Sequence, residues 1–130
     1  MNEPSIESML FTVKQTKKTI YDVGIDLKER EYRIEITDRY GHTQGPTTDG
    51  QLRRSSVNKF LSSLNDQDFH SWKKLEQGIL PLNLESATVM YSVDGEMYYT
   101  QGNSDDDLAF LHKTIEQLIG TTFGTYEFYK

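Results

Sequence analysis

Residues 86–120 read SATVMYSVDGEMYYTQGNSDDDLAFLHKTIEQLIG and contain the strongest local signals in the chain. Asp94-Gly95 is typical of the two-residue type I′ turn of a β-hairpin, which needs positive φ at both central positions. This turn pairs Tyr91 with Tyr98, on a face of the hairpin that we assign to the core. The alternation of side chains along each strand then predicts an outward face made of Met90, Ser92, Met97 and Tyr99.

A helix is predicted directly after this hairpin. Ser104 can cap its first N–H groups, and the three aspartates at 105–107 lie where the helix dipole favours negative charge. Gly120 is suited to the left-handed conformation that ends a helix. The apolar stripe expected to cover the hairpin consists of Leu108, Leu111, Ile115 and Leu118.

Two further strands are predicted upstream. Residues 19–27 show the clearest alternation in the chain, with Tyr21, Val23, Ile25 and Leu27 on one face and Asp22 and Asp26 on the other, which is typical of a strand with one wet face. A charged turn at 28–31 leads to a second, antiparallel strand that contains Tyr32, Ile34 and Ile36. Residues 42–50 hold two glycines, a proline and three threonines, and are expected to form a loop or a poor edge strand.

The remaining elements follow from helical spacing and aromatic content. Apolar residues of 5–14 recur at helical intervals, so a short helix is predicted there. A second helix is expected from Ser55 or Ser56, with a break near Asn65-Asp66. The aromatic residues near the end of the chain favour a last strand over residues 125–129.

This order predicts an α+β fold, an antiparallel β-sheet with helices packed mainly on one face. The hairpin-then-helix plan occurs twice, in halves of about 65 residues, without repetition of residue identities. A chain of 130 residues is expected to form a single globular domain over residues 1–130.

The run 88–118 resembles the closing segment of small bacterial α+β domains of unknown function, where a strand, a Gly turn, a second strand, a polar loop and a Leu-rich helix follow one another. Leu61-Ser62-Ser63-Leu64 and Ser71-Trp72-Lys73 are similar to the helix and tryptophan that precede that segment. The resemblance covers about residues 18–119, although the proline that often opens the final helix is missing here. It implies the fold and no activity.

Composition and charge narrow the class of protein. There are no cysteines, and the chain shows neither a signal peptide nor an apolar run long enough to cross a membrane, so a cytoplasmic protein of bacterial style is expected. Residues 66–130 hold eleven acidic residues and four lysines, a balance of −7. The negative electrostatic field of this half disfavours binding to nucleic acid and anionic membranes and favours a basic partner. The alternative is that the acidic surface serves solubility alone.

The residue patterns of catalytic and metal sites are missing. His42, His70 and His112 are far apart in sequence, and none lies at a metal-ligand spacing. His112 is expected to be a partly covered surface residue and His70 to pack near Trp72. The chain has no P-loop, no G-x-S-x-G elbow and no dinucleotide-binding glycine motif. We therefore expect no catalytic residue, no metal and no cofactor.

The outward aromatic and methionine residues are the main candidates for a contact surface. Met90, Met97 and Tyr99 are of types enriched in protein interfaces, and Phe110 lies nearly opposite the helix stripe. Two acidic residues, Glu96 and Glu127, are expected at the rim of this surface. The alternative is that the helix predicted at 5–14 covers this face of the sheet.

Two functions remain open. The first is a small non-enzymatic protein that acts through a protein interface, as an adaptor, an inhibitor-like partner or a homodimer. The second is a small-molecule binding domain, with a ligand held between sheet and helices. Its pocket would be lined by Trp72, Tyr91 and Tyr98.

Overall fold

The computed structural model has a six-stranded antiparallel sheet with two helices packed against it, which confirms the α+β prediction. It describes residues 6–14, 20–38, 40, 42–43, 45, 47–72, 74, 87–101 and 105–121. Its elements are β1 (Ile6–Lys14), β2 (Ile20–Asp26), β3 (Glu31–Thr37), β4 (Thr48–Gln51), α1 (Arg54–Asp66), the 3₁₀ turn η1 (Phe69–Ser71), β5 (Ala87–Val93), β6 (Glu96–Thr100) and α2 (Asp105–Ile119).

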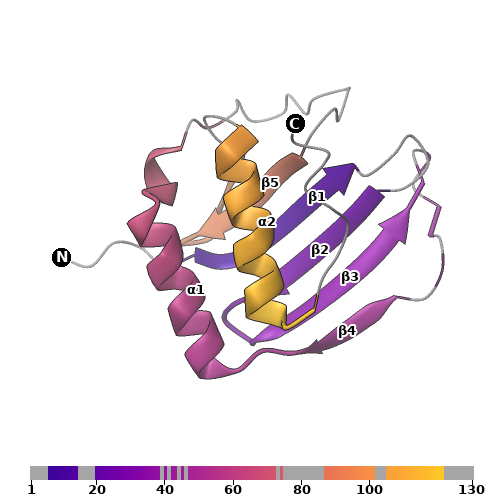
Figure 1. Ribbon diagram of the computed structural model, residues 1–130, viewed down its shortest axis with the longest axis horizontal. Helices are drawn as coiled ribbons and strands as arrows, with labels where there is room; N and C mark the ends of the chain where they lie inside the picture. Colours follow the sequence, from indigo (N-terminus) through magenta and orange to yellow (C-terminus); the bar gives the residue numbers. More distant parts are fainter. Residues whose placement is uncertain are drawn as a thin grey trace.

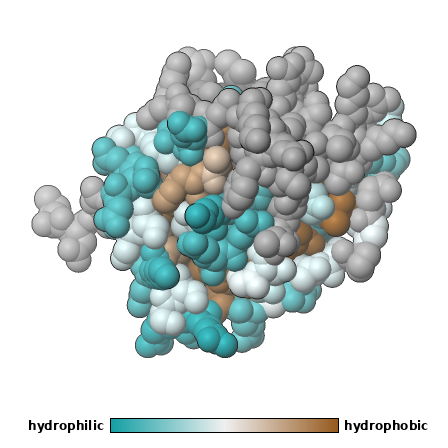
Figure 2. All heavy atoms as spheres, in the orientation of Figure 1, coloured by the Kyte–Doolittle hydropathy of each residue, from teal (hydrophilic) through white to brown (hydrophobic). Residues whose placement is uncertain are grey.

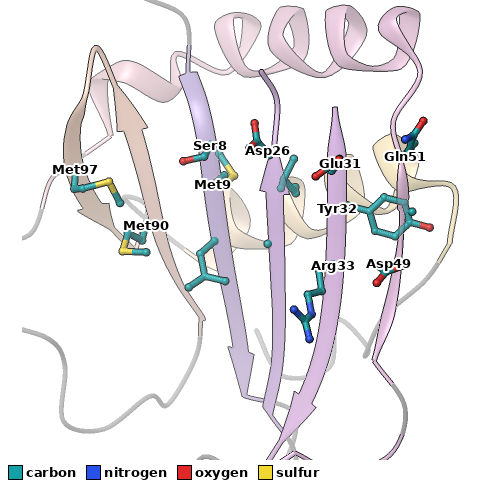
Figure 3. A pocket seen from close by; sticks show the side chains of 14 residues that line it. Ser8, Met9, Asp26, Glu31, Tyr32, Arg33, Asp49, Gln51, Met90 and Met97 are labelled. Atoms are coloured by element: carbon teal, nitrogen blue, oxygen red, sulfur yellow. The ribbon is translucent and has the colours of Figure 1, made fainter. Parts of the chain in front are cut away.

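The strands lie in the order β4-β3-β2-β1-β5-β6, so the first strand lies in the middle of the sheet. Figure 1 shows α1 and α2 side by side in front of one sheet face. Among the described residues no helix lies on the opposite face (Figures 1 and 3). The described part of the chain therefore forms two layers, and one face of the sheet is left open.

Both predicted hairpins are confirmed. Asp94 and Gly95 have φ of 52° and 81°, as a type I′ turn requires, and Tyr91 pairs with Tyr98. The β2–β3 pair is antiparallel, with Val23 opposite Ile34. The end of the predicted loop or poor edge strand at 42–50, together with residue 51, forms the short strand β4, which pairs with β3 at the edge of the sheet.

The helix predicted at residues 5–14 is wrong, because this segment is the central strand β1. Met9, Phe11 and Val13 alternate toward the core, while Leu10 faces the other way. A register irregularity between Ile6 and Ser8 returns the buried Ile6 to the core face. This irregularity spaces buried Ile6 and Met9 three residues apart, which mimics a helical period.

The two later helices agree with the sequence pattern. α1 begins at Arg54 and buries Val57, Phe60 and Leu64. The four residues of the predicted α2 stripe are all buried, and Gly120 has φ of 77° after the last helical residue. The strand predicted at 125–129 lies outside the described residues.

His112 differs from its expected place at the surface. It is fully buried, its ring packs edge-on against Phe11, and its Nε2 lies 3.6 Å from Oε2 of Glu116. The ring therefore belongs to the contact between α2 and the central strand. His70 packs edge-on against Phe69, whose ring also lies against that of Trp72.

Candidate functional site

The strand registers divide the sheet side chains between a helix-covered face and an open face. Phe11, Val23 and Val89 lie in one row across the sheet and are fully buried beneath the helices. The next row has the opposite orientation and forms the middle of the open face. Its members are Tyr99, Met90, Leu10, Gly24, Arg33 and Asp49, in the order of the strands from β6 to β4.

A hollow of about 660 Å³ lies on this open face and is lined by residues of all six strands. Figure 3 looks onto it, with the helices behind the sheet. Gly24, in the interior of β2, contributes no side chain, and it stands between Leu10 and Arg33. The missing side chain leaves room at the middle of the hollow.

Nothing in the described structure requires glycine at position 24. Its φ is not positive, and a Cβ placed there would lie 3.9 Å from the carbonyl oxygen of Arg33, an ordinary contact. Glycine in a strand interior weakens the strand, and it often marks a place where another molecule comes close to the backbone. The glycine thus costs stability and keeps the open face accessible.

Apolar side chains line one half of the hollow. Leu10, Met90 and Met97 come from the three neighbouring strands β1, β5 and β6, and Met97 is 37% exposed. Figure 3 shows the two methionines together at the β5–β6 side. Tyr99 pairs with Met90 and shares its face, although it is not among the residues that line the hollow.

Acidic side chains dominate the other half. Asp26, Glu31 and Asp49 come from β2, β3 and β4 and line the hollow together with Arg33 (Figure 3). Nη2 of Arg33 lies 3.1 Å from Oε1 of Glu35, so this cation already has an acidic partner. The hollow is therefore apolar at one end and negative at the other.

Two pairs of acidic residues stand directly opposite each other on β2 and β3. Asp26 faces Glu31, and Asp22 faces Glu35. Like charges in directly opposed cross-strand positions destabilise a sheet. Both pairs lie on the open face, because side chains two residues apart on a strand point to the same side of the sheet. Asp22 and Asp26 lie two residues from Gly24 on β2, and Glu31 and Glu35 lie two residues from Arg33 on β3.

Asp22 is held by two threonines of the same face. Its two carboxylate oxygens accept hydrogen bonds from Thr12 Oγ1 at 3.0 Å and Thr37 Oγ1 at 3.3 Å. Partial burial raises the pKa of Asp22; the two hydrogen bonds oppose this change, and the nearby Glu35 adds to it. Asp22 is therefore a restrained carboxylate beyond the edge of the hollow.

The predicted interface residues are brought together only in part. The prediction that Met90, Met97 and Tyr99 share the outward face is confirmed. Glu96 shares the face of Tyr98 instead, and its Oε2 accepts a hydrogen bond of 2.8 Å from the Tyr98 hydroxyl. Glu127 lies outside the described residues.

Phe110 does not join this surface. It lies on α2, in the helix layer, and is a partly buried residue packed against the core. The expectation that it lacks a core contact is therefore wrong. The helical period gives the angle between Phe110 and the buried stripe of α2, but it does not show how wide the buried face of the helix is.

The aromatic residues expected to line a ligand pocket pack against one another. Trp72 is 2% exposed and Tyr91 1%, and the ring of Phe69 lies 4.8 Å from each of theirs. Tyr91 in turn lies 5.6 Å from Tyr98. The Tyr91 hydroxyl is buried without a hydrogen-bond partner among the described residues, and burial raises its pKa. Side chains occupy the space where a ligand was expected.

A second hollow lies between the helices. It measures about 130 Å³ and is lined by residues of α1 and α2, among them Phe60 and Leu118. Figure 2 shows an apolar band between the hydrophilic outer surfaces of the two helices. The hollow is much smaller than the pockets of several hundred Å³ that hold drug-sized ligands.

The described residues offer neither a metal site nor a membrane-spanning helix. No cluster of three or more His, Asp or Glu side chains in this part of the chain is placed to hold a metal ion. No helix among the same residues has the length and apolar character needed to cross a membrane.

The chain matches no family model, no curated protein and no solved structure. The likeness to small bacterial domains of unknown function thus stays a prediction.

Several residues of the open face escaped the sequence reasoning, namely Leu10, Gly24, Asp26, Glu31 and Asp49. The sequence pattern predicts a helix at Leu10, the wet face of a strand at Asp26, a turn at Glu31, and a loop or poor edge strand at Asp49. The glycine carried a usable signal, because it interrupts the polar positions of an otherwise regular alternation.

Proposed function

We propose that this chain is a small non-enzymatic binding protein that engages a protein partner through the open face of its sheet. The observation that carries the proposal is the hollow around Gly24, bordered on one side by Leu10, Met90 and Met97. Apolar side chains grouped on a sheet face that no described element covers are typical of an interaction surface. Methionine adapts its shape to a partner at little cost, which suits this role.

The packing in the core favours this function over binding of a small ligand between sheet and helices. The side chains expected to line that pocket, Trp72, Tyr91 and Tyr98, fill the space with their own rings. The larger hollow is broad and lies on the outside of the sheet. A surface of that kind suits a protein segment better than an enclosed small molecule.

The cytoplasmic location remains part of the proposal. It is supported by the absence of cysteine from the sequence, because a chain that forms no disulfide does not need an oxidising compartment to fold. A partner in the same compartment would meet the open face directly.

The experiment fills the hollow without touching the core. Gly24→Val adds a β-branched side chain at a position where a Cβ has space, and valine is favoured in strands. The control is Ser62→Val, which places the same side chain on the exposed surface of α1. Proteins retained by the wild type, Gly24→Val and Ser62→Val are compared by affinity enrichment and mass spectrometry, using extracts of cells that express the chain.

The proposal predicts that a partner retained by the wild type and Ser62→Val is lost with Gly24→Val. A denaturation midpoint of Gly24→Val at or above that of the wild type shows that the fold is intact. If Gly24→Val unfolds, Gly24→Ala and Met97→Ala test the same surface with smaller changes. Retention of every partner by all folded variants would overturn the proposal.

A further inference from the structure

The charges of the open face identify the chemistry of its partner. Among the charged residues that line the hollow, Asp26, Glu31 and Asp49 are acidic, and Arg33 is basic and paired with Glu35. Lys28 and Arg30 lie next to this region, in the turn between β2 and β3, together with Glu29. The end of the hollow formed by β2, β3 and β4 therefore carries a surplus of negative charge.

This negative charge is arranged at a cost to folding. Asp26 stands opposite Glu31, and Asp22 opposite Glu35, so each acidic pair lowers the stability of the sheet. Asp26 has a structural role, because its Oδ1 accepts hydrogen bonds from the backbone N–H groups of Lys28 and Glu29. That role does not require a second acid at position 31. Solubility alone would be served equally well by acidic residues placed apart.

Apolar and acidic groups also follow a fixed order across the sheet. Met90 lies on β5 and Glu31 on β3, three strand positions apart. At about 4.8 Å between neighbouring strands, and with Glu31 two residues along β3 from the row of Met90, this separation is about 16 Å. A partner would bridge it with about five residues of extended chain, at about 3.3 Å each.

We infer that the open face binds a basic protein segment, with an apolar side chain on Leu10, Met90 and Met97 and lysines or arginines over Asp26, Glu31 and Asp49. The inference rests on the proposed function and specifies its partner. Face-to-face stacking of two copies fits less well, because the acidic half would meet acidic or apolar groups and never a surplus of cations. A basic segment relieves the repulsion between the opposed acids.

The test selects binding segments from random sequences. A displayed library of random peptides is selected on the immobilised full chain. Each peptide is about 16 residues long, several times the length of extended chain needed to bridge the apolar and acidic groups. Enriched peptides are then measured against Gly24→Val and against Glu31→Lys/Asp49→Lys. The matched control is Asp66→Lys/Asp106→Lys, which makes the same change in net charge at exposed positions of the two helices.

We expect enriched peptides to combine Lys or Arg with an apolar residue at the spacing above. Their affinity should fall about tenfold or more on Glu31→Lys/Asp49→Lys and on Gly24→Val, and by less than about twofold on the control. Binding should also weaken as salt concentration rises, because exposed charges are screened.

The other outcomes separate the inference from the proposed function. Peptides that are blocked by Gly24→Val but unaffected by Glu31→Lys/Asp49→Lys would overturn the basic partner and leave the open face as the docking site. A wild-type dimer in sedimentation that Gly24→Val dissociates would overturn the inference in favour of a second copy. If no peptide is enriched, or if the enriched peptides bind Gly24→Val and Glu31→Lys/Asp49→Lys as tightly as the wild type, both proposals are overturned.

Discussion

The ring of Tyr32 lies over Gly50 on the neighbouring strand, in the space that a side chain at position 50 would need. A Cβ built on Gly50 would lie 2.8 Å from both Cε1 and the hydroxyl oxygen of Tyr32. Gly50→Ala should therefore lower the free energy of unfolding, by about 0.5–1.5 kcal/mol, the cost of moving the Tyr32 side chain away from its preferred rotamer. Urea denaturation of the variant measures the loss.

Gly24→Ala is the matched control, because it makes the same change in a strand where the new methyl group has space. It should leave stability unchanged or raise it. In a Tyr32→Ala background the cost of Gly50→Ala should shrink, since the ring that opposes the methyl group is gone. If Gly50→Ala lowers the free energy of unfolding by the same amount in that background, backbone effects and not the Tyr32 ring explain the glycine at position 50.

The α2 stripe gives a second prediction. Leu111 is fully buried and Leu118 is 6% exposed, at the border of the hollow between the helices. Both alanine variants should lose stability within about 2–5 kcal/mol, with the larger loss at Leu111. Chemical denaturation measures both, with exposed Lys113→Ala as the control. A loss below about 1 kcal/mol at Leu111 would contradict its place in the core.

Local sequence signals accounted for most of the fold. The hairpins and α2 were predictable because Asp94-Gly95, the alternation in 19–27 and the stripe ending at Gly120 each act within one element. The identity of β1 was not, because a register irregularity changed its apparent period. The strand order is also beyond such signals, since it depends on contacts between residues far apart in the chain.

The candidate site was predictable to a smaller extent. Alternation placed Met90, Met97 and Tyr99 on the outward face, and that orientation is confirmed. The rest of the open face required the sheet order, because β2 and β3 meet β5 only through β1. Gly24 interrupts the polar positions of its strand, but the room that it leaves appears only when Leu10 and Arg33 lie on either side of it.

The raised pKa of Asp22 predicts a specific dependence of stability on pH. Burial holds the folded-state pKa above the usual 3.8, so the native state keeps this proton to a higher pH than the unfolded state does. The contribution of Asp22 to the free energy of unfolding therefore falls as pH rises through the window between 3.8 and the folded-state value, and this loss stays constant above it.

Asp22→Asn removes this titration. Relative to wild type, the stability of Asp22→Asn should rise across that window and then reach a plateau, in urea denaturation at a series of pH values. Thr12→Val deletes a hydrogen bond that favours the ionised carboxylate, so it should extend the wild-type decline to higher pH. A difference between Asp22→Asn and wild type that does not vary with pH would contradict the assignment.

The opposed acids of β2 and β3 give the last prediction. Glu31 stands directly across from Asp26, and a lysine there would replace a like-charge pair with an opposite-charge pair. Glu31→Lys should raise the free energy of unfolding by about 0.2–1 kcal/mol, and Glu31→Gln by less. The gain should disappear at high salt, because both side chains reach solvent and are screened. Urea denaturation of the three proteins at low and high salt measures it.

A Glu31→Lys protein no more stable than Glu31→Gln at low salt would show that the two carboxylates do not repel. If Glu31→Lys is more stable than the wild type but no longer binds the basic peptides enriched in the selection, Glu31 is retained for binding at the expense of stability.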